Sequence, residues 1–229
     1  MSRLSLALAA ACLAAPAAAQ DTDLELVLLA DASGSIDEGE IRFQREGYAE
    51  AITDPEVLAA IEGTAYGSIA VTYVEWASHT AQVVGWTRID GAESAAGFAA
   101  SLRDEPRRAY GRNAIGSALL DALRLIERND IDGWRRVIDF SGDSANSYAG
   151  PGIAEARDEV VAAGVTINAL PILRPEDGRR AGANLEAAMP AFMMGGAKGI
   201  EPFVKKFQDT MMRVKYAAVP VVPAVQPVW

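Results

Sequence analysis

Residues 24–35 read LELVLLADASGS, and this stretch decides the fold. The apolar run 26–30 is typical of a central parallel strand, because helices cover both faces of such a sheet. After it come the carboxylate of Asp31 and the hydroxyls of Ser33 and Ser35, at every second residue, with Gly34 permitting a sharp turn. Oxygen ligands at the end of a strand suit Mg²⁺, which binds one or two carboxylates and keeps several waters. The alternative is a Ser/Gly/Asp turn that caps the next helix.

The rest of the chain alternates strand patterns with helix patterns. A hairpin at one edge of the sheet is expected over residues 68–77 and 81–86. Asp37 and Glu40 form a capping box at the start of the first helix, and Asp54 with Pro55 starts the second. This alternation predicts an α/β fold with a doubly wound, mostly parallel sheet. Further strands are expected at 137–140 and 165–172, and further helices at 92–103, 115–126, 153–163 and from Pro202 onward.

The D-x-S-x-S spelling resembles the signature of von Willebrand factor type A domains, whose metal-ion-dependent adhesion site (MIDAS) begins there. That family adds a threonine in a loop before a helix and an aspartate after the next strand. The matching places are Asn113, within GRNAIG, and Asp143, within SGDS. The resemblance extends over roughly residues 24–214 and looks closest to a secreted branch recorded as a domain of unknown function. It implies a Rossmann-like, mostly parallel sheet with one antiparallel edge strand.

The resemblance also implies a divalent-cation site, with Mg²⁺ favoured over Mn²⁺ or Ca²⁺. Its ligand set is Asp31, Ser33, Ser35, Asn113 and Asp143. The two aspartates close strands that lie side by side in such folds, and a cation between them relieves the repulsion of their charges. Asn113 stands where the family has threonine, which leaves two interpretations open. It caps the helix that follows, as asparagine often does, or its side-chain oxygen ligates the ion directly or through water.

Binding and catalysis are the two function classes to separate. His79 is the single histidine, and no H-E-x-x-H, G-x-S-x-G or G-x-x-x-x-G-K motif is present, so the sequence gives little support for an enzyme. The resemblance implies a protein-binding module in which a partner's Asp or Glu carboxylate completes the coordination of the ion. The alternative is a metal-dependent hydrolase acting on a phosphate or an ester. A net charge of −10, from 21 basic and 31 acidic residues, argues against a nucleic-acid partner.

Residues 1–19 have the pattern of a signal peptide. Arg3 precedes an apolar stretch at 4–13, and Ala17-Ala18-Ala19 supplies the cleavage site. Cleavage before Cys12 would instead give a lipoprotein, but Ala9 stands where a lipobox usually has leucine. No other run reaches the roughly 20 apolar residues of a membrane span. We therefore expect a periplasmic or secreted protein without disulfides, with one domain at 20–216 and a tail rich in proline and valine at 217–229.

Overall fold

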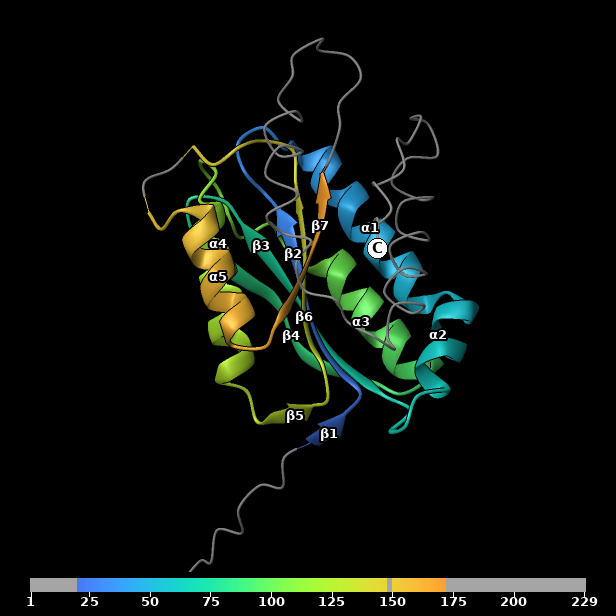
Figure 1. Cartoon of the computed structure of the whole chain (residues 1–229). Helices are drawn as coiled ribbons and strands as arrows, with labels where there is room; N and C mark the ends of the chain where they lie inside the picture. The colour runs from blue at the N-terminus through green and yellow to red at the C-terminus, as the bar shows by residue number, and fades with distance from the viewer. Residues whose placement is uncertain (1–19, 148–149, 172–229) are drawn as a thin grey trace, which may run out of the picture.

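The central sheet has five strands in the order β4-β3-β2-β6-β7 (Figure 1). All neighbouring pairs are parallel except β3 with β4, which form an antiparallel hairpin at one edge. This confirms the predicted mostly parallel sheet with one antiparallel edge strand. The strands are β2 (Leu24–Asp31), β3 (Ile69–Trp76), β4 (Thr80–Ile89), β6 (Arg136–Gly142) and β7 (Thr166–Pro171).

The computed structural model describes residues 20–147 and 150–171. The predicted signal peptide (1–19), the helix expected from Pro202 and the tail at 217–229 lie outside the described residues. In the part that the structure describes, no helix is long and apolar enough to cross a membrane.

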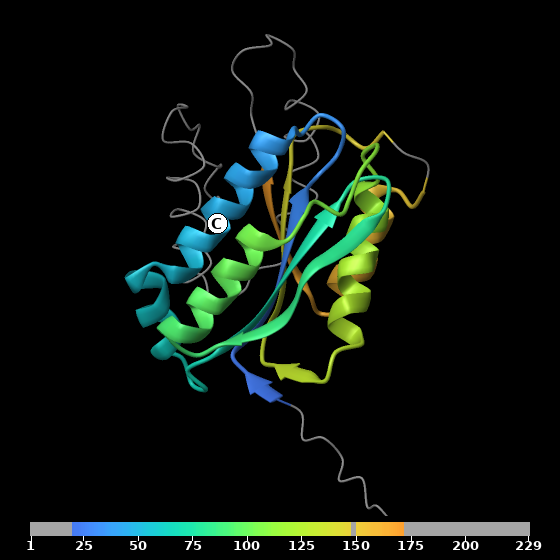
Figure 2. The same ribbon diagram turned by 180° about the vertical axis from the view of Figure 1, so that it is seen from behind.

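Helices cover both faces of the sheet (Figures 1 and 2). One face carries α1 (Glu38–Thr53), α2 (Pro55–Glu62) and α3 (Ala92–Asp104); the other carries α4 (Ile115–Glu127) and α5 (Ile153–Ala162). Strand β2 explains the arrangement, because successive side chains of a strand point to opposite faces. Leu24, Leu26 and Leu28 pack toward the first group of helices, and Val27 and Leu29 toward the second. The uninterrupted apolar run is therefore buried on both sides, as predicted.

The local signals at the helix starts are also present. The Asp37 carboxylate accepts a hydrogen bond from Glu40 N, and the Glu40 carboxylate accepts one from Asp37 N, which completes the capping box of α1. The Asp54 carboxylate accepts from the backbone N–H groups of Glu56 and Val57 at the start of α2. These caps satisfy backbone donors that have no partner inside the helix.

A second, two-stranded sheet was not predicted. Strands β1 (Gln20–Thr22) and β5 (Ile131–Gly133) pair in parallel near the amino ends of the main strands. Each has three residues, which is too short for a two-residue periodicity to stand out from the sequence.

Candidate metal site

The predicted site residues lie at the carboxyl ends of two adjacent strands. Asp31 is the last residue of β2, and Asp143 directly follows β6, its parallel neighbour. From β2 the chain continues to β3 on one side and later returns to β6 on the other, so the strand order reverses between these two strands. Ligands of doubly wound sheets bind at such a reversal point, beyond the carboxyl ends of the strands.

Four of the five predicted residues are joined by hydrogen bonds. The Asp31 carboxylate accepts from Ser33 N at 2.8 Å and from Asp143 N at 3.1 Å. The hydroxyl oxygens of Ser33 and Ser35 lie 3.1 Å apart, and the Ser35 hydroxyl donates to Asp143 Oδ1 at 2.9 Å. Mg²⁺ holds its six oxygen ligands at 2.0–2.1 Å, which places neighbouring ligands of an octahedron about 2.9 Å apart. The two distances between these side-chain oxygens, 3.1 and 2.9 Å, are close to that spacing.

Asp31 contributes a buried carboxyl group to the site. Its side chain is fully buried, and this burial, with the nearby charge of Asp143, raises the pKa of Asp31 from 3.8 to about 6. Hydrogen bonds from Ser33 and Asp143 oppose the shift without cancelling it. A carboxylate in this environment is stabilised by a cation, because a nearby opposite charge favours the ionised form.

Asn113 does not cap the following helix, so that interpretation of the sequence is wrong. The cap position of α4 is Ala114, which offers no side-chain hydrogen bond. The acceptor comes instead from the loop after β6, where Asn146 Oδ1 accepts from Ile115 N at 3.0 Å. The side-chain acceptor for Ile115 N thus lies 31 positions away along the chain, beyond the reach of a local sequence signal.

Replacing Asn146 by alanine is expected to lower the free energy of unfolding by about 1 kcal/mol, since a helix start loses its side-chain acceptor. Asn146→Asp keeps an acceptor and adds a negative charge at the positive end of the helix dipole, so we expect it to be neutral or slightly stabilising. Urea denaturation of the two variants measures the difference. Equal destabilisation by both would contradict a capping role.

The Asn113 side chain is buried next to the loop that carries Asp143. Its Oδ1 accepts from Ser147 Oγ at 3.3 Å, and its backbone N donates to the same hydroxyl at 3.2 Å. Its Nδ2 has no hydrogen-bond partner among the described residues. Turning the amide over exchanges the two atoms, so that Nδ2 donates to Ser147 and Oδ1 takes the partnerless position. Asn113 can therefore offer an oxygen without losing its contact with Ser147.

Sequence reasoning missed Arg107, which holds the loop that carries the two serines. Its guanidinium donates to the backbone oxygens of Ala32 at 2.6 Å, Ser33 at 3.2 Å and Ile36 at 3.0 Å. These bonds occupy carbonyl oxygens of the loop and fix its path, while the Ser35 hydroxyl donates to Asp143 and lies beside the hydroxyl of Ser33. Arg107 belongs to an irregular loop with no periodic pattern, so no sequence signal distinguishes it from a solvated arginine.

Gly34 acts differently from the prediction. Its φ angle is not positive, so the turn does not need the conformational freedom of glycine. Instead its N–H donates to Gly111 O at 2.7 Å, joining the serine loop to the loop before α4. A Cβ on Gly34 would lie 3.4 Å from that oxygen, which is an ordinary contact distance. The role of Gly34 is therefore the backbone hydrogen bond that links the two loops, and the absence of a side chain matters less.

The single histidine contacts the loop that precedes α4. His79 occupies the exposed turn between β3 and β4, and its Nε2 lies 3.1 Å from the backbone oxygen of Arg108. Among residues 20–147 and 150–171, no three His, Cys, Asp or Glu side chains come together as a metal cluster. Any ion at the candidate site would thus depend on hydroxyl and amide oxygens in addition to Asp31 and Asp143.

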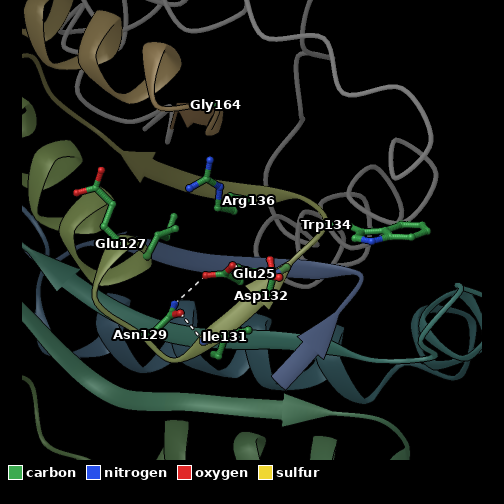
Figure 3. Close-up of a pocket in the computed structure, with 10 residues that line it drawn as sticks. Glu25, Glu127, Asn129, Ile131, Asp132, Trp134, Arg136 and Gly164 are labelled. Carbon is green, nitrogen blue, oxygen red and sulfur yellow. Dashed lines mark hydrogen bonds between the residues drawn. The ribbon is translucent and has the colours of Figure 1, made fainter. Parts of the chain in front are cut away.

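A cavity of about 400 Å³ lies at the opposite end of the sheet, where β2 and β6 begin (Figure 3). Glu25 lines it, and burial raises the pKa of this carboxyl group. Its two oxygens accept hydrogen bonds from Asn129 Nδ2 at 2.7 Å and Gly133 N at 2.9 Å. These contacts tie β2 to the segment before β6, which gives Glu25 a structural role.

Comparison with known proteins finds the same fold in several adhesion and matrix proteins. The pilus adhesin SpaC from Lactobacillus rhamnosus GG matches with a TM-score of 0.56 at 11% identity, over 86% of this chain and 31% of the adhesin. A von Willebrand factor type A protein from Catenulispora acidiphila matches with a TM-score of 0.54 at 16% identity, over 85% of this chain and 43% of that protein. Proximal thread matrix protein 1 from the mussel byssus, with a zinc-occupied MIDAS motif, matches with a TM-score of 0.52 at 18% identity, over 68% and 39%.

At these identities the likeness shows the fold alone, and the chain spans less than half the length of each of these proteins. A search of curated proteins finds no match. A family model does match, over residues 21–215. The chain has the fold of a von Willebrand factor type A domain, and it belongs to the family described as protein of unknown function DUF1194.

Proposed function

We propose that this protein is an extracytoplasmic, metal-dependent protein-binding module. Its MIDAS-like site binds one divalent cation, most favourably Mg²⁺, through Asp31, Ser33, Ser35, Asn113 and Asp143. A partner protein completes the coordination with an Asp or Glu carboxylate.

The observation that carries the proposal is the spacing of the oxygens. Ser33 Oγ, Ser35 Oγ and Asp143 Oδ1 follow one another at 3.1 and 2.9 Å, close to the roughly 2.9 Å between neighbouring ligands of octahedral Mg²⁺. Asp31 lies behind them, hydrogen-bonded to the backbone of Ser33 and Asp143, and supplies charge from a buried position.

Such a site supports binding because its protein ligands come from three loops and leave positions for water. A carboxylate can displace one of those waters. In a chain of net charge −10, the bound ion would be the local charge that attracts an anionic partner.

The relatives in fold support the same function class. They include a pilus adhesin and a byssus matrix protein, the latter with a zinc-occupied MIDAS motif. Proteins of pili and byssus threads act outside the cell, in keeping with the export expected from residues 1–19 of this chain.

Melting of the full chain should rise with Mg²⁺ or Mn²⁺ in the wild type and stay unchanged in Asp143→Ala. A ligand that binds only the folded state stabilises it by about 2.7 kcal/mol at a hundred times its Kd. Asn113→Thr should keep the effect if residue 113 offers an oxygen to the ion.

Capture of partners from an envelope extract should need the cation and fail in EDTA and in Asp31→Ala.

Two results would count against this function. The first is a melting temperature of the wild type that no divalent cation changes, together with no heat of binding in calorimetry. This result would contradict the metal site. Turnover of a generic phosphatase or esterase substrate that is abolished by Asp31→Ala would favour the hydrolase alternative.

A further inference from the structure

The loop at residues 106–112 reads PRRAYGR and concentrates positive charge beside the candidate site, in a chain of net charge −10. Two of its three arginines are engaged within the protein. Arg107 donates to the carbonyl oxygens of the serine loop, and Arg108 pairs with Glu105 Oε2 at 2.5 Å. Arg112 is exposed, and across residues 20–147 and 150–171 its guanidinium has no hydrogen bond or ion pair.

The backbone of Arg112 lies between two contacts with the metal-site loops. On one side, Gly111 O accepts from Gly34 N at 2.7 Å, and Gly34 separates the two serines. On the other side, Asn113 N donates to Ser147 Oγ at 3.2 Å, on the loop that carries Asp143. Consecutive Cα atoms are about 3.8 Å apart. The Cα atom of Arg112 therefore lies about 3.8 Å from those of Gly111 and Asn113, the two residues that make these contacts.

The loop is held in place before any partner arrives. Ser78 Oγ accepts from Arg112 N at 2.6 Å, and Ser78 N donates to Tyr110 O at 3.3 Å. Gly111 has a φ angle of +110°, and a Cβ there would lie 2.4 Å from Ser78 Oγ, so glycine alone fits this approach. A fixed backbone lowers the entropy lost when a side chain on it engages a ligand.

Tyr110 adds an aromatic surface to the same loop. Its side chain is 53% exposed, its ring lies 4.8 Å from the Arg107 guanidinium, and its hydroxyl donates to Arg107 O at 2.9 Å. Exposed tyrosine and arginine side chains are enriched at the energetic centres of protein interfaces. Tyr110 and Arg112 lie on the same loop beside the metal-site loops, so this loop marks the side on which a partner would make contact.

We propose that Arg112 is a specificity-determining anchor for a second carboxylate of the partner, beside the one that reaches the ion. This inference rests on the proposed function and narrows it. The partner segment would carry two neighbouring acidic groups, because a guanidinium binds a carboxylate through two parallel hydrogen bonds. A partner with a single acidic group would leave Arg112 without an anion.

The test uses the full chain loaded with Mn²⁺, with glutarate as a dicarboxylate probe and butyrate as a monocarboxylate of similar length. The relaxation rate of water protons is raised by water bound to Mn²⁺. A decrease in this rate therefore measures how far each acid displaces that water. In the wild type we expect glutarate to act at a concentration about tenfold lower than butyrate, the factor that one charge-assisted contact supplies. Arg112→Gln should reduce this preference to the roughly twofold statistical advantage of a ligand with two equivalent ends.

The matched control is Arg108→Gln, which removes a charge from the same loop but from an arginine already paired with Glu105. It should keep the tenfold preference, and both variants should keep the Mn²⁺ and butyrate affinities of the wild type. The same preference in wild type and Arg112→Gln, with Mn²⁺ bound and water displaced, would overturn the role of Arg112 alone. Failure of the wild type to bind Mn²⁺, or of both acids to displace water, would overturn the proposed function and this inference with it.

Discussion

Glu75→Ala is expected to lower the free energy of unfolding by about 3–5 kcal/mol, because removing one member of a buried ion pair leaves the other charge without compensation. Glu75 lies on β3 with a fully buried side chain, and Arg45 on α1 is 5% exposed. Glu75 Oε1 accepts from Arg45 at 2.6 Å, while Oε2 accepts from the backbone N–H groups of Arg108 at 2.7 Å and Ala109 at 3.3 Å. Urea denaturation of the purified variant gives the value.

The protein supplies its own control, an ion pair of the same chemistry on the surface. Arg103 binds both carboxylate oxygens of Glu46 at 2.6 and 2.8 Å, but the side chains are 44% and 41% exposed. Exposed pairs contribute about 0–1 kcal/mol, so Glu46→Ala should change stability by no more than that. If the two variants lost comparable free energies of unfolding, burial would not determine how much such an ion pair contributes to stability.

The buried pair also supports the candidate site. The Arg45 guanidinium donates to the backbone oxygens of Glu105 and of Pro106, the latter at 3.1 Å. Glu75 accepts from the backbone N–H groups of Arg108 and Ala109. Together they hold the loop from which Arg107 reaches the serine loop and from which Arg112 projects. We infer that a change at Glu75 affects cation affinity through this loop, although Glu75 does not belong to the ligand set.

The sheet and its helices were predictable because their signals are local or periodic. The run from Leu26 to Ala30 needed only its own composition to mark a strand buried on two faces, and both faces are packed. Asp37 with Glu40, and Asp54 with Pro55, marked helix starts within three residues. The D-x-S-x-S spacing likewise located one half of the candidate site.

The remaining contacts join residues far apart in sequence, and their residue types fit many roles. Arginine in a loop is usually solvated, so nothing marked Arg107 as the residue that holds the serine loop. Asn113 has the residue type and position of a helix cap, yet Asn146 takes that role from another loop. Such assignments depend on which loops the fold brings together, and local pattern carries no information on that.

Asp31→Asn is expected to make the metal-free protein more stable than the wild type near neutral pH, by about 2 kcal/mol. Burial raises the pKa of Asp31 from 3.8 to about 6 in the folded state. The fold therefore favours the protonated form, and stability is lost as the pH rises from about 4 through about 6. Two pKa units correspond to about 3 kcal/mol. Asparagine avoids this cost but gives up one of the two hydrogen bonds that the carboxylate accepts, worth about 1 kcal/mol.

Adding the cation should reverse the order of the two proteins. Mg²⁺ at a hundred times its Kd stabilises the wild type by about 2.7 kcal/mol, whereas Asp31→Asn lacks the charge that attracts the ion.

Urea denaturation in EDTA and in MgCl₂, at about pH 4 and about pH 7, measures the difference in stability between the variant and the wild type under each of these four conditions. The advantage of the variant in EDTA should vanish near pH 4, where Asp31 is protonated. Asp132→Asn is the matched control, because this exposed aspartate lies at the opposite end of the sheet, so the variant should gain the same stability from Mg²⁺ as the wild type does. If Asp31→Asn were less stable than the wild type in EDTA near neutral pH, the buried charge would not be the cost inferred here. Asp31 would then be ionised near neutral pH even without a cation, stabilised by the hydrogen bonds from the backbone of Ser33 and Asp143.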